Sequence, residues 1–288
     1  MSSRILTSLR FSGITQPDRS RHRVARGIRT CHDALVTAAR IEFDSDVFSR
    51  SGFTLLVDGA AQSHVDREDP TRLFFEYVRR IGHVIDSVRE LGAPIRALHL
   101  GGGAFTIPRY VEATRPDSSQ VVVDHDAELV DTVLDRLPLP AGADIAIVLA
   151  DAREALASFA AGPPFDVVVV DLYTRLEAPA FVDEPEFMGG CLELLAPGGV
   201  VVVNVADAAG LARLAAQARA LARADPSAEL LVAGDPSVLA GADEGNSVLV
   251  AAPQGLPSRL EERLAAAGPF PGEVLTGHRL DAVLWGAC

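Results

Sequence analysis

The segment Arg96–Ala104 constrains the fold of this chain more than any other. An apolar run, Ala-Leu-His-Leu, ends in three consecutive glycines, Gly101, Gly102 and Gly103, and a helix-like segment follows them. A buried strand that ends in glycines and turns into a helix is the usual opening of a nucleotide-cofactor site. Glycine permits a tight turn and lets the backbone approach a ligand with no Cβ in the way. The segment therefore predicts a strand, a close turn and a helix around a nucleotide.

Strand-like and helix-like segments alternate along most of the chain. Apolar strands are expected at 95–100, 120–124, 144–149, 166–170 and 199–205, and helices at about 106–115, 126–136, 152–161, 184–196 and 207–223. Five such repeats predict a parallel sheet with helices on both faces. Two later runs, 229–232 and 246–251, would close this sheet as an antiparallel edge pair, and 259–267 predicts a further helix. The predicted fold class is α/β and Rossmann-like, with a mainly parallel seven-stranded sheet.

A small antiparallel unit is expected ahead of this sheet. The run 41–48 partly alternates, and Asp58-Gly59 is a hairpin turn signal that lets 60–65 pair back. A helix is expected to start at Asp69-Pro70, with an apolar face of Leu73, Phe74, Tyr77, Val78, Ile81, Ile85 and Val88. The predicted domains are an Arg-rich, loosely packed N-terminal extension (1–38), a small β-hairpin domain (39–68) and a catalytic domain (69–288).

Composition excludes several classes of function. The formal net charge is −13, which argues against nucleic-acid binding and suits cationic small substrates. The chain has no lysine, so Schiff-base chemistry and a P-loop are excluded. Without a long apolar run or a secretory signal, we expect a cytoplasmic protein with no membrane span. The three cysteines are scattered, which suits that compartment and predicts no metal site.

Acidic residues follow three more of the predicted strands. Asp124, Asp151 and Asp171 stand where ligands bind beyond the carboxyl ends of parallel strands, although Asp151 is equally consistent with a helix cap. The sixth position of a dinucleotide fingerprint is Thr106 and not glycine. A ligand that needs ribose- and adenine-binding acids but no pyrophosphate clamp fits best, which favours S-adenosylmethionine or a derivative of it.

Several blocks of the sequence resemble the spermidine synthase family. They are Leu56-Val-Asp-Gly-Ala-Ala-Gln62, Leu100-Gly-Gly-Gly103, Val123-Asp-His-Asp126, Ala150-Asp-Ala152, Asp166-Val-Val-Val-Val-Asp171 and Pro197-Gly-Gly199. The resemblance runs from about Ile41 to Leu280. It implies a class I methyltransferase-like domain behind a small N-terminal β domain, usually as a homodimer. It also implies transfer of an aminopropyl group from decarboxylated S-adenosylmethionine to an amine such as putrescine, with methylthioadenosine released and no metal involved.

The resemblance also implies roles for individual residues. Gln62 is similar to a glutamine that contacts the methylthioadenosine moiety, and Asp124 to the acid that holds the ribose hydroxyls. Asp151 and the Ala152 backbone are similar to the pair that reads adenine, and Asp171 to the catalytic aspartate. The remaining expected cofactor-binding residues are Gly101, Gly102, Gly103 and His125, and Tyr173 is the second expected catalytic residue.

The sequence departs from the family pattern at two places. The glycine motif usually continues with an acid that binds the amine end of the donor, and here it continues with Ala104. The catalytic aspartate is usually followed by a second acid that holds the acceptor, and here Leu-Tyr-Thr-Arg175 follows. Tyr173 is expected to replace part of that hydrogen bonding. A methyltransferase or other alkyl-transfer enzyme with another acceptor, and a catalytically silent nucleoside binder, are the alternative interpretations.

Other candidate residues have structural interpretations. His99 lies in mid-strand and is expected to be a hydrogen-bonded core histidine. His64 and His83 flank the small β unit, within reach of the predicted pocket. Core packing is the default interpretation for Tyr77 and for Cys191, which lies in a predicted amphipathic helix.

Overall fold

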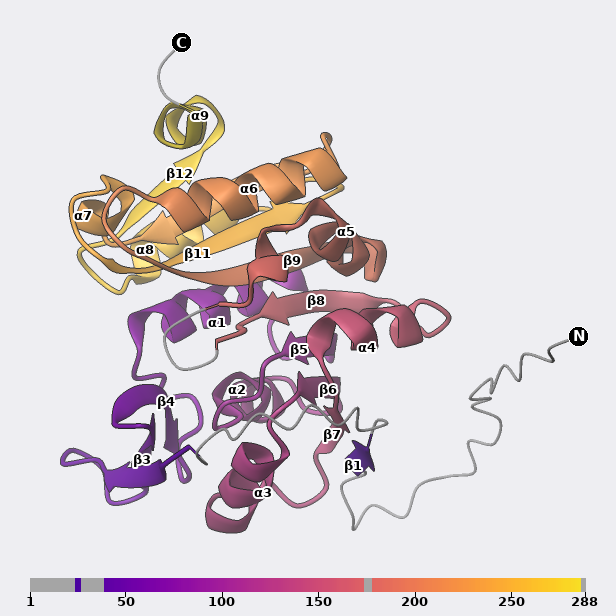
Figure 1. Ribbon diagram of the computed structural model, residues 1–288, viewed down its shortest axis with the longest axis vertical. Coiled ribbons are helices and arrows are strands. Elements are labelled where there is room, and N and C mark those ends of the chain that lie inside the picture. The colour runs from indigo at the N-terminus through magenta and orange to yellow at the C-terminus, as the bar shows by residue number, and fades with distance from the viewer. Residues whose placement is uncertain (1–23, 27–38, 174–177, 286–288) are drawn as a thin grey trace, which may run out of the picture.

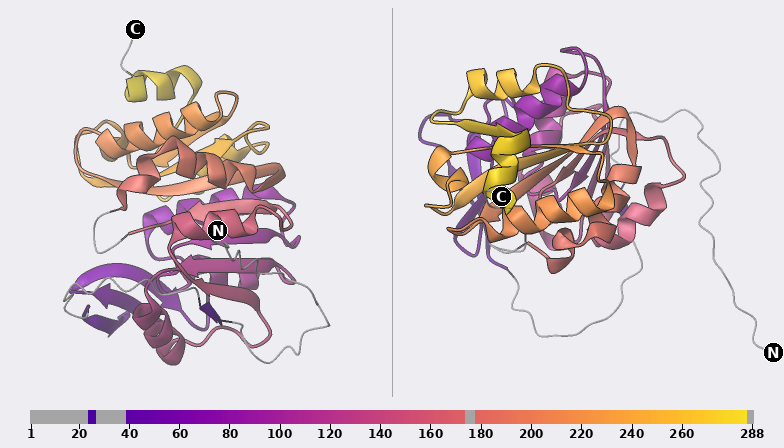
Figure 2. Two further views of the ribbon diagram at one scale, coloured as in Figure 1. Left: turned by 45° about the vertical axis from the view of Figure 1, so that its right-hand side comes forward. Right: turned by 90° about the horizontal axis from the view of Figure 1, so that it is seen from above.

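The chain folds around one large twisted sheet (Figures 1 and 2). The structure is a computed structural model that describes residues 24–26, 39–173 and 178–285. The sheet has nine strands in the order β1-β7-β6-β5-β8-β9-β11-β10-β12, and a second sheet has the order β2-β3-β4. The first six strands of the large sheet run parallel, and β11, β10 and β12 are antiparallel to their neighbours. This is the α/β, mainly parallel Rossmann-like arrangement that the sequence predicts.

The elements have the following bounds. The strands are β1 Val24–Arg26, β2 Ile41–Ser45, β3 Gly52–Val57, β4 Ala60–Asp66, β5 Arg96–Leu100, β6 Ser119–Asp124, β7 Asp144–Leu149, β8 Phe165–Val170, β9 Leu195–Asp207, β10 Glu229–Gly234, β11 Gly245–Ala252 and β12 Glu273–Thr276. The helices are α1 Glu76–Val88, α2 Thr106–Thr114, α3 Ala127–Arg136, α4 Ala152–Phe159, α5 Pro185–Glu193, α6 Ala212–Ala224, α7 Pro236–Leu239, α8 Leu260–Ala267 and α9 Gly277–Trp285, with the 3-10 turn η1 Ala180–Asp183.

The predicted count of seven strands is wrong, because one strand is added at each edge. β1, inside the predicted 1–38 extension, pairs with β7, and β12, in the C-terminal tail, pairs with β10. The predicted antiparallel edge pair also differs in place. β11 inserts between β9 and β10, so neither β10 nor β11 forms the edge. The rest of the predicted extension lies outside the described residues, and the division into domains stays a prediction.

Hydrophobic side chains pack against both faces of the large sheet. Valines of β8 and β9 alternate between the two faces, as the period of a strand requires. Val168 and Val201 join a core covered by α4, α5, α6 and α9, while Val167 and Val200 join one covered by α1, α2 and α8. A third cluster lies under α3 and the small sheet. Among the described residues no helix is long and apolar enough to cross a membrane.

The predicted helix start at Asp69-Pro70 is wrong, because α1 begins at Glu76. The Asp69 carboxylate accepts hydrogen bonds from the backbone N–H and the hydroxyl of Thr71, which favours a turn over a helix. One residue later, the Arg72 guanidinium reaches across to Asp46, at 2.6 Å. Leu73 and Phe74 therefore precede the helix and do not lie on its apolar face.

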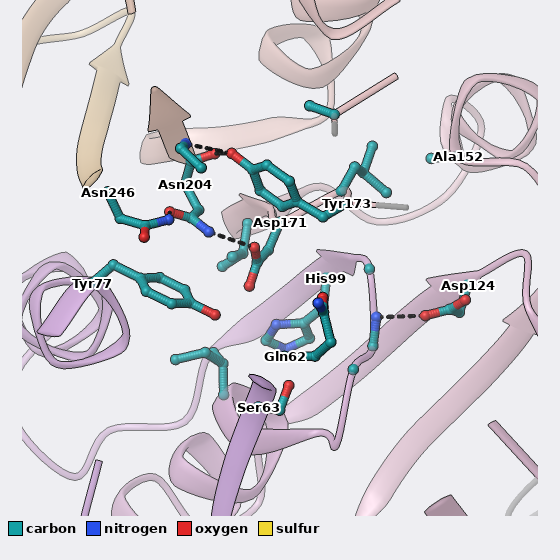
Figure 3. A pocket seen from close by; sticks show the side chains of 18 of the residues that line it. Gln62, Ser63, Tyr77, His99, Asp124, Ala152, Asp171, Tyr173, Asn204 and Asn246 are labelled. Atoms are coloured by element: carbon teal, nitrogen blue, oxygen red, sulfur yellow. Dashed lines mark hydrogen bonds between the residues drawn. The ribbon is translucent and has the colours of Figure 1, made fainter. Parts of the chain in front are cut away.

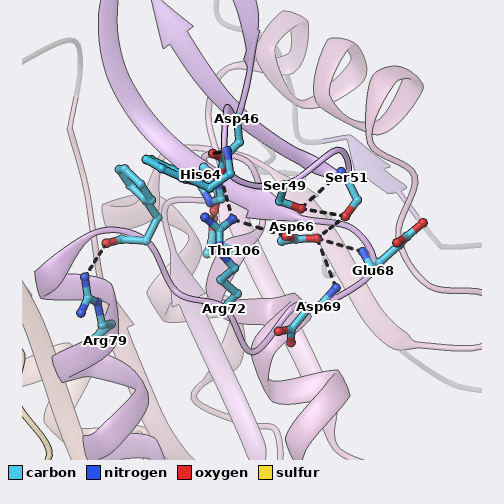
Figure 4. A network of polar contacts seen from close by, with 12 residues as sticks. Asp46, Ser49, Ser51, His64, Asp66, Glu68, Asp69, Arg72, Arg79 and Thr106 are labelled. Atoms are coloured by element: carbon cyan, nitrogen blue, oxygen red, sulfur yellow. Dashed lines mark hydrogen bonds and ion pairs between the residues drawn. The ribbon is translucent and has the colours of Figure 1, made fainter.

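A polar network holds the small sheet against this turn (Figure 4). The Asp46 carboxylate accepts hydrogen bonds from the Phe48 backbone and from Arg72, which hold the pKa of Asp46 at about 2. Burial alone would raise the pKa of Asp66, but hydrogen bonds from hydroxyls and backbone N–H groups outweigh it and lower this pKa to about 2 as well. His64 lies beside Asp46, at 3.0 Å. Two ionised carboxylates therefore tie the small sheet to the entry of α1.

Gly101 makes the closest backbone approach at the end of β5. Its φ is +96°, and a Cβ built on it would lie 2.1 Å from the carbonyl oxygen of Asp171. The Asp171 N–H donates to the Leu100 carbonyl at 2.9 Å, which keeps the ends of β5 and β8 together. Only glycine satisfies both the backbone angle and the space.

The low pKa values of Asp46 and Asp66 predict an acid-sensitive stability. Because both are depressed below the unfolded value near 3.8, their stabilisation is present above that pH and is lost as pH falls from about 4 towards 2. Asp46→Asn should lower the free energy of unfolding at pH 7 and flatten its decline in this window, as measured by urea denaturation. Asp44→Asn, exposed on β2, is the control. An unchanged decline for Asp46→Asn would contradict the assignment.

The close contact at Gly101 predicts that this position does not tolerate a larger residue. Gly101→Ala should destabilise the chain by more than about 2 kcal/mol, because the strain of a positive φ is joined by a clash with backbone that cannot move away cheaply. Gly59→Ala is the matched control, since Gly59 also has a positive φ but no atom within 4 Å of its built Cβ. Equal losses for the two variants in denaturant melts would show that the close approach is unimportant.

Candidate functional site

A cavity of about 1770 Å³ opens beyond the carboxyl ends of the parallel strands. Its lining includes every site residue that the sequence predicts: Gln62, Gly101, Gly102, Gly103, Asp124, His125, Asp151, Ala152, Asp171 and Tyr173. The set is spread over more than 100 positions of the chain, from Gln62 to Tyr173. Apart from Gln62 on β4, its members meet because parallel strands end at one edge of the sheet. The volume has room for a nucleoside together with a second small substrate.

The order of the strands spreads these residues along the sheet edge. Asp151 follows β7, Asp124 ends β6, the glycines follow β5, and Asp171 follows β8. The predicted nucleoside-binding residues thus lie on one side of the cavity, and Asp171 lies towards its middle (Figure 3).

Asp124 is a buried carboxylate held by the backbone. One oxygen accepts from the Gly102 N–H at 2.8 Å and the other from the Asp126 N–H at 2.9 Å. Burial raises the pKa of Asp124, and these two hydrogen bonds oppose the rise. Each carboxylate oxygen can accept more than one hydrogen bond, so Asp124 can also accept hydrogen bonds from the hydroxyl groups of a ligand.

The other predicted nucleoside residues lie around Asp124. The Asp151 carboxylate caps α4 by accepting a hydrogen bond from the Arg153 N–H at 2.8 Å, as the helix-cap interpretation expects. Asp151 also lines the cavity. His125 is 59% exposed and approaches Asp124 at 4.0 Å. Gln62, on β4, lies opposite the glycine turn (Figure 3).

Asp171 is the carboxylate at the centre of the cavity wall. Its Oδ1 accepts a hydrogen bond from the Asn204 amide at 2.8 Å. Burial raises the pKa of Asp171, and hydrogen bonds from Asn204 and Tyr77 pull it back only in part. A carboxylate with a raised pKa in a cavity is well suited to accept a proton.

Tyr77 belongs to this site, which the default interpretation of core packing missed. Its ring packs against the core beneath α1, but its hydroxyl points into the cavity towards Asp171 (Figure 3). Burial raises the pKa of Tyr77 far above 10, and the charge of Asp171 adds to the effect. The hydroxyl therefore stays protonated and donates. The apolar periodicity of the helix gave no sign of this role, because a tyrosine on an apolar helix face is expected to be a core residue.

Tyr173 is held by the backbone of β9. Its hydroxyl donates to the Asn204 carbonyl at 2.9 Å and accepts from the Ala206 N–H at 2.5 Å. These contacts hold the ring against β9. Because the hydroxyl proton is already donated to the Asn204 carbonyl, the hydroxyl cannot donate a hydrogen bond to a substrate at the same time. The predicted replacement of the missing acid by Tyr173 is therefore limited to accepting a hydrogen bond. Residues 174–177, including Arg175, lie outside the described residues.

Two asparagines complete the wall beside Asp171. Asn204 comes from β9 and Asn246 from β11, and the Asn246 amide donates to the Asn204 side-chain oxygen at 2.9 Å. Asn204 stands in a run of valines, Val200 to Val205, where a polar residue in a buried strand is a usable signal. Asn246 gave no such signal, because its strand was expected at the edge of the sheet.

The histidines and the cysteine have different surroundings. His99 is buried and bonds Gln120 at 3.0 Å, as expected, although it also lines the cavity; burial lowers its pKa to about 4. His64 is buried in the Asp46 network, and neither it nor His83 belongs to the cavity lining. Cys191 is fully buried as expected, and burial raises the pKa of its thiol.

Ala104 points away from the cavity. Its methyl group is fully buried in the cluster under the small sheet, and its N–H donates to the Ser63 hydroxyl at 3.2 Å. The following residue, Phe105, is also buried and has a φ of +59°, a left-handed conformation that is uncommon for an aromatic residue. Packing of this side chain holds the turn in the shape that glycine adopts freely.

Curated proteins match parts of this chain. The probable polyamine aminopropyl transferase of Bifidobacterium longum is 34% identical over 109 residues, which are 38% of this chain and 24% of that protein. The polyamine aminopropyltransferase of Neisseria meningitidis serogroup A is 28% identical over 145 residues, which are 50% of this chain and 53% of that protein. The chain therefore spans about half or less of the length of these relatives. No family model matches it.

Solved structures match most of the chain. The crystal structure of a probable spermidine synthase from Corynebacterium glutamicum is 26% identical, with a TM-score of 0.77 over 91% of this chain and 95% of that one. A spermidine synthase in complex with the transition-state analogue AdoDATO is 18% identical, with a TM-score of 0.52 over 80% of this chain and 74% of that one, and shares the fold. In its fold and in the sequence blocks at the strand ends, the chain is therefore similar to proteins of the spermidine synthase family.

Proposed function

We propose that this chain is an aminopropyltransferase, which moves an aminopropyl group from decarboxylated S-adenosylmethionine to an amine and releases methylthioadenosine. The observation that carries the proposal is the place of Asp171. It lies at the end of β8, beside the glycine turn and close to the Tyr77 hydroxyl and the Asn204 amide, in the wall of the cavity that also contains the predicted nucleoside-binding residues.

The charge of the cavity favours cationic substrates. Its described lining contains eight carboxylate side chains, at Glu76, Asp124, Asp126, Glu128, Asp151, Asp171, Asp183 and Asp235, and two guanidinium groups, at Arg80 and Arg213. Both substrates of the proposed reaction are cations, one a sulfonium and the other an ammonium. A concave site with one dominant sign of charge concentrates ligands of the opposite sign.

Asp171 supports the chemical step as follows. An alkyl ammonium has a pKa near 10 and must lose a proton before its nitrogen can attack. Asp171 would accept that proton and orient the amine. The nitrogen then forms a bond to the methylene carbon next to the sulfonium as the carbon–sulfur bond breaks, and the electron pair neutralises the sulfur. Alignment of nitrogen and carbon at about 3–3.5 Å is the main contribution of such a site.

The nucleoside side of the site would hold the donor. Asp124 would bind the ribose hydroxyls, and Asp151 with the Ala152 backbone would read the adenine. Gln62 and the glycine turn would contact the sugar and the thioether. The burial of Ala104 leaves no acid at the position that holds the donor amine in the family pattern. A homodimer and a cytoplasmic location stay predictions that accompany this function.

Identification of the nucleoside product tests the proposal directly. Purified protein is incubated with decarboxylated S-adenosylmethionine, or with S-adenosylmethionine, and a panel of amines. We expect methylthioadenosine by liquid chromatography and mass spectrometry. Asp171→Asn should lower turnover by at least about 100-fold, the scale of general base catalysis, and leave methylthioadenosine affinity nearly unchanged. S-adenosylhomocysteine as the product would instead establish methyl transfer.

The surroundings of Asp171 predict the pH dependence. Because burial raises its pKa, activity should fall on the acid side at a pH above the ordinary value of 3.8 for a carboxyl group. Tyr77→Phe removes a hydrogen bond that stabilises the carboxylate, so the acid limb of kcat/KM should move to higher pH. Tyr110→Phe, whose hydroxyl bonds Asp86 outside the cavity, is the control. If the acid limb of the Tyr77→Phe variant stays at the same pH, Tyr77 does not influence the pKa of Asp171.

A further inference from the structure

The acceptor side of the cavity continues past Asp171 along the sheet edge. Because β11 is antiparallel to β9 and β10, its first residues lie at the edge where the parallel strands end. Asn246, near the start of β11, therefore lines the cavity beside Asn204. Asp235 follows β10 directly and lines the cavity as well. Gly234 pairs with Ser247, so Asp235 and Asn246 hold adjacent places on neighbouring strands.

The amide groups have a fixed polarity. An ionised Asp171 only accepts hydrogen bonds, so Asn204 must present its NH₂ group to it. The Asn204 oxygen then accepts from the NH₂ group of Asn246. All donors therefore point towards Asp171, and the carbonyl oxygen of Asn246 is left on the side away from Asn204 (Figure 3). This oxygen is a hydrogen-bond acceptor at the cavity wall, one strand from Asp235.

Asp235 brings a negative charge to this place. One of its oxygens accepts from the Ser237 N–H at 2.8 Å and from the Ser237 hydroxyl at 2.7 Å, and these bonds lower the pKa of Asp235. On α1, Arg80 interacts with Asp235 through its charge and bonds Glu76 at 3.3 Å. Two carboxylates and one guanidinium give this end of the cavity one net negative charge. A second ammonium group would neutralise it.

We infer that Asp235 and Asn246 form a subsite for the second, non-reacting ammonium of a diamine acceptor. The inference rests on the proposed function, since it takes the acceptor to be an amine. Asp235, after β10, supplies the charge that the sequence lacks after Asp171, and Asn246 on β11 adds a neutral hydrogen-bond acceptor. Three strand spacings of about 4.8 Å separate the chain at Asp171 from that at Asp235. Both residues line the cavity, so two ammonium groups that bind them would be separated by several methylene groups.

A binding experiment tests the subsite without relying on turnover. The full chain is saturated with methylthioadenosine and titrated by calorimetry with 1,4-diaminobutane and with 1-aminobutane, which lacks the second amine. The wild type should bind the diamine more tightly. Asp235→Asn should weaken diamine binding by about 10- to 100-fold, the range for a hydrogen bond to a charged group, and leave monoamine binding unchanged. Asparagine caps a helix as well as aspartate does, so α7 should keep its start.

The chain offers a matched control. Asp225-Pro226-Ser227 repeats the sequence of Asp235-Pro236-Ser237, and Asp225 makes the same two hydrogen bonds to its serine, but it does not line the cavity. Asp225→Asn should therefore leave the binding of both amines unchanged. Asp235→Ser, which also keeps a capping side chain, is the second variant if Asp235→Asn folds poorly.

The outcomes separate this inference from the proposed function. Equal affinities of the wild type for the two amines, an equal loss for both in Asp235→Asn, or no binding of the diamine would overturn the subsite. Selective loss of diamine binding supports it, whichever nucleoside product the transfer assay shows. Absence of methylthioadenosine with every amine overturns the proposed function alone.

Discussion

The contact between Gly101 and the backbone of Asp171 is the constraint on which the site depends. It joins the end of β5 to the end of β8, two neighbouring strands whose loops serve different parts of the cavity. The glycine turn faces the predicted nucleoside site, and Asp171 faces the open side. With no side chain between them, the backbone of Asp171 lies as near to the glycine turn as van der Waals contact permits. The group transfer proposed for this chain would benefit from this arrangement, because proximity and alignment of two bound molecules lower the barrier to their reaction.

The electrostatic setting of Asp171 follows from the same position. The end of a central strand is buried, and burial alone disfavours a charged carboxylate. Neutral donors compensate in part: the hydroxyl of Tyr77 from α1 and the amide of Asn204 from β9. A guanidinium partner would have fixed the carboxylate in its ionised form and lowered its pKa. Neutral partners leave the pKa of Asp171 raised, which suits a carboxylate that accepts a proton.

The parallel part of the fold and the cavity-lining positions at its strand ends were predictable from the sequence. Each apolar run predicts a strand, and the residue that follows it marks the end of the strand where a ligand is expected. These residues are Gly101, Asp124, Asp151 and Asp171, and all four line the cavity. The start of α1 was not predictable from periodicity, because Arg72 is drawn to Asp46, 26 residues earlier in the chain. The same is true of Tyr77, whose ring obeys the apolar pattern while only its hydroxyl reaches the cavity.

The order of the last strands was beyond such local reasoning, and the acceptor side of the cavity depends on it. Had β10 and β11 formed an edge pair in chain order, β10 would lie next to β9 and Asp235 would follow the strand beside Asn204. With β11 inserted instead, Asn246 comes next to Asn204 and Asp235 lies one strand further out. A neutral amide thus separates two carboxylates, and the repulsion between Asp171 and Asp235 is reduced by distance. The antiparallel insertion therefore sets the spacing of negative charge along the cavity, and in the proposed function it also sets the spacing of the positive charges that a diamine acceptor can carry.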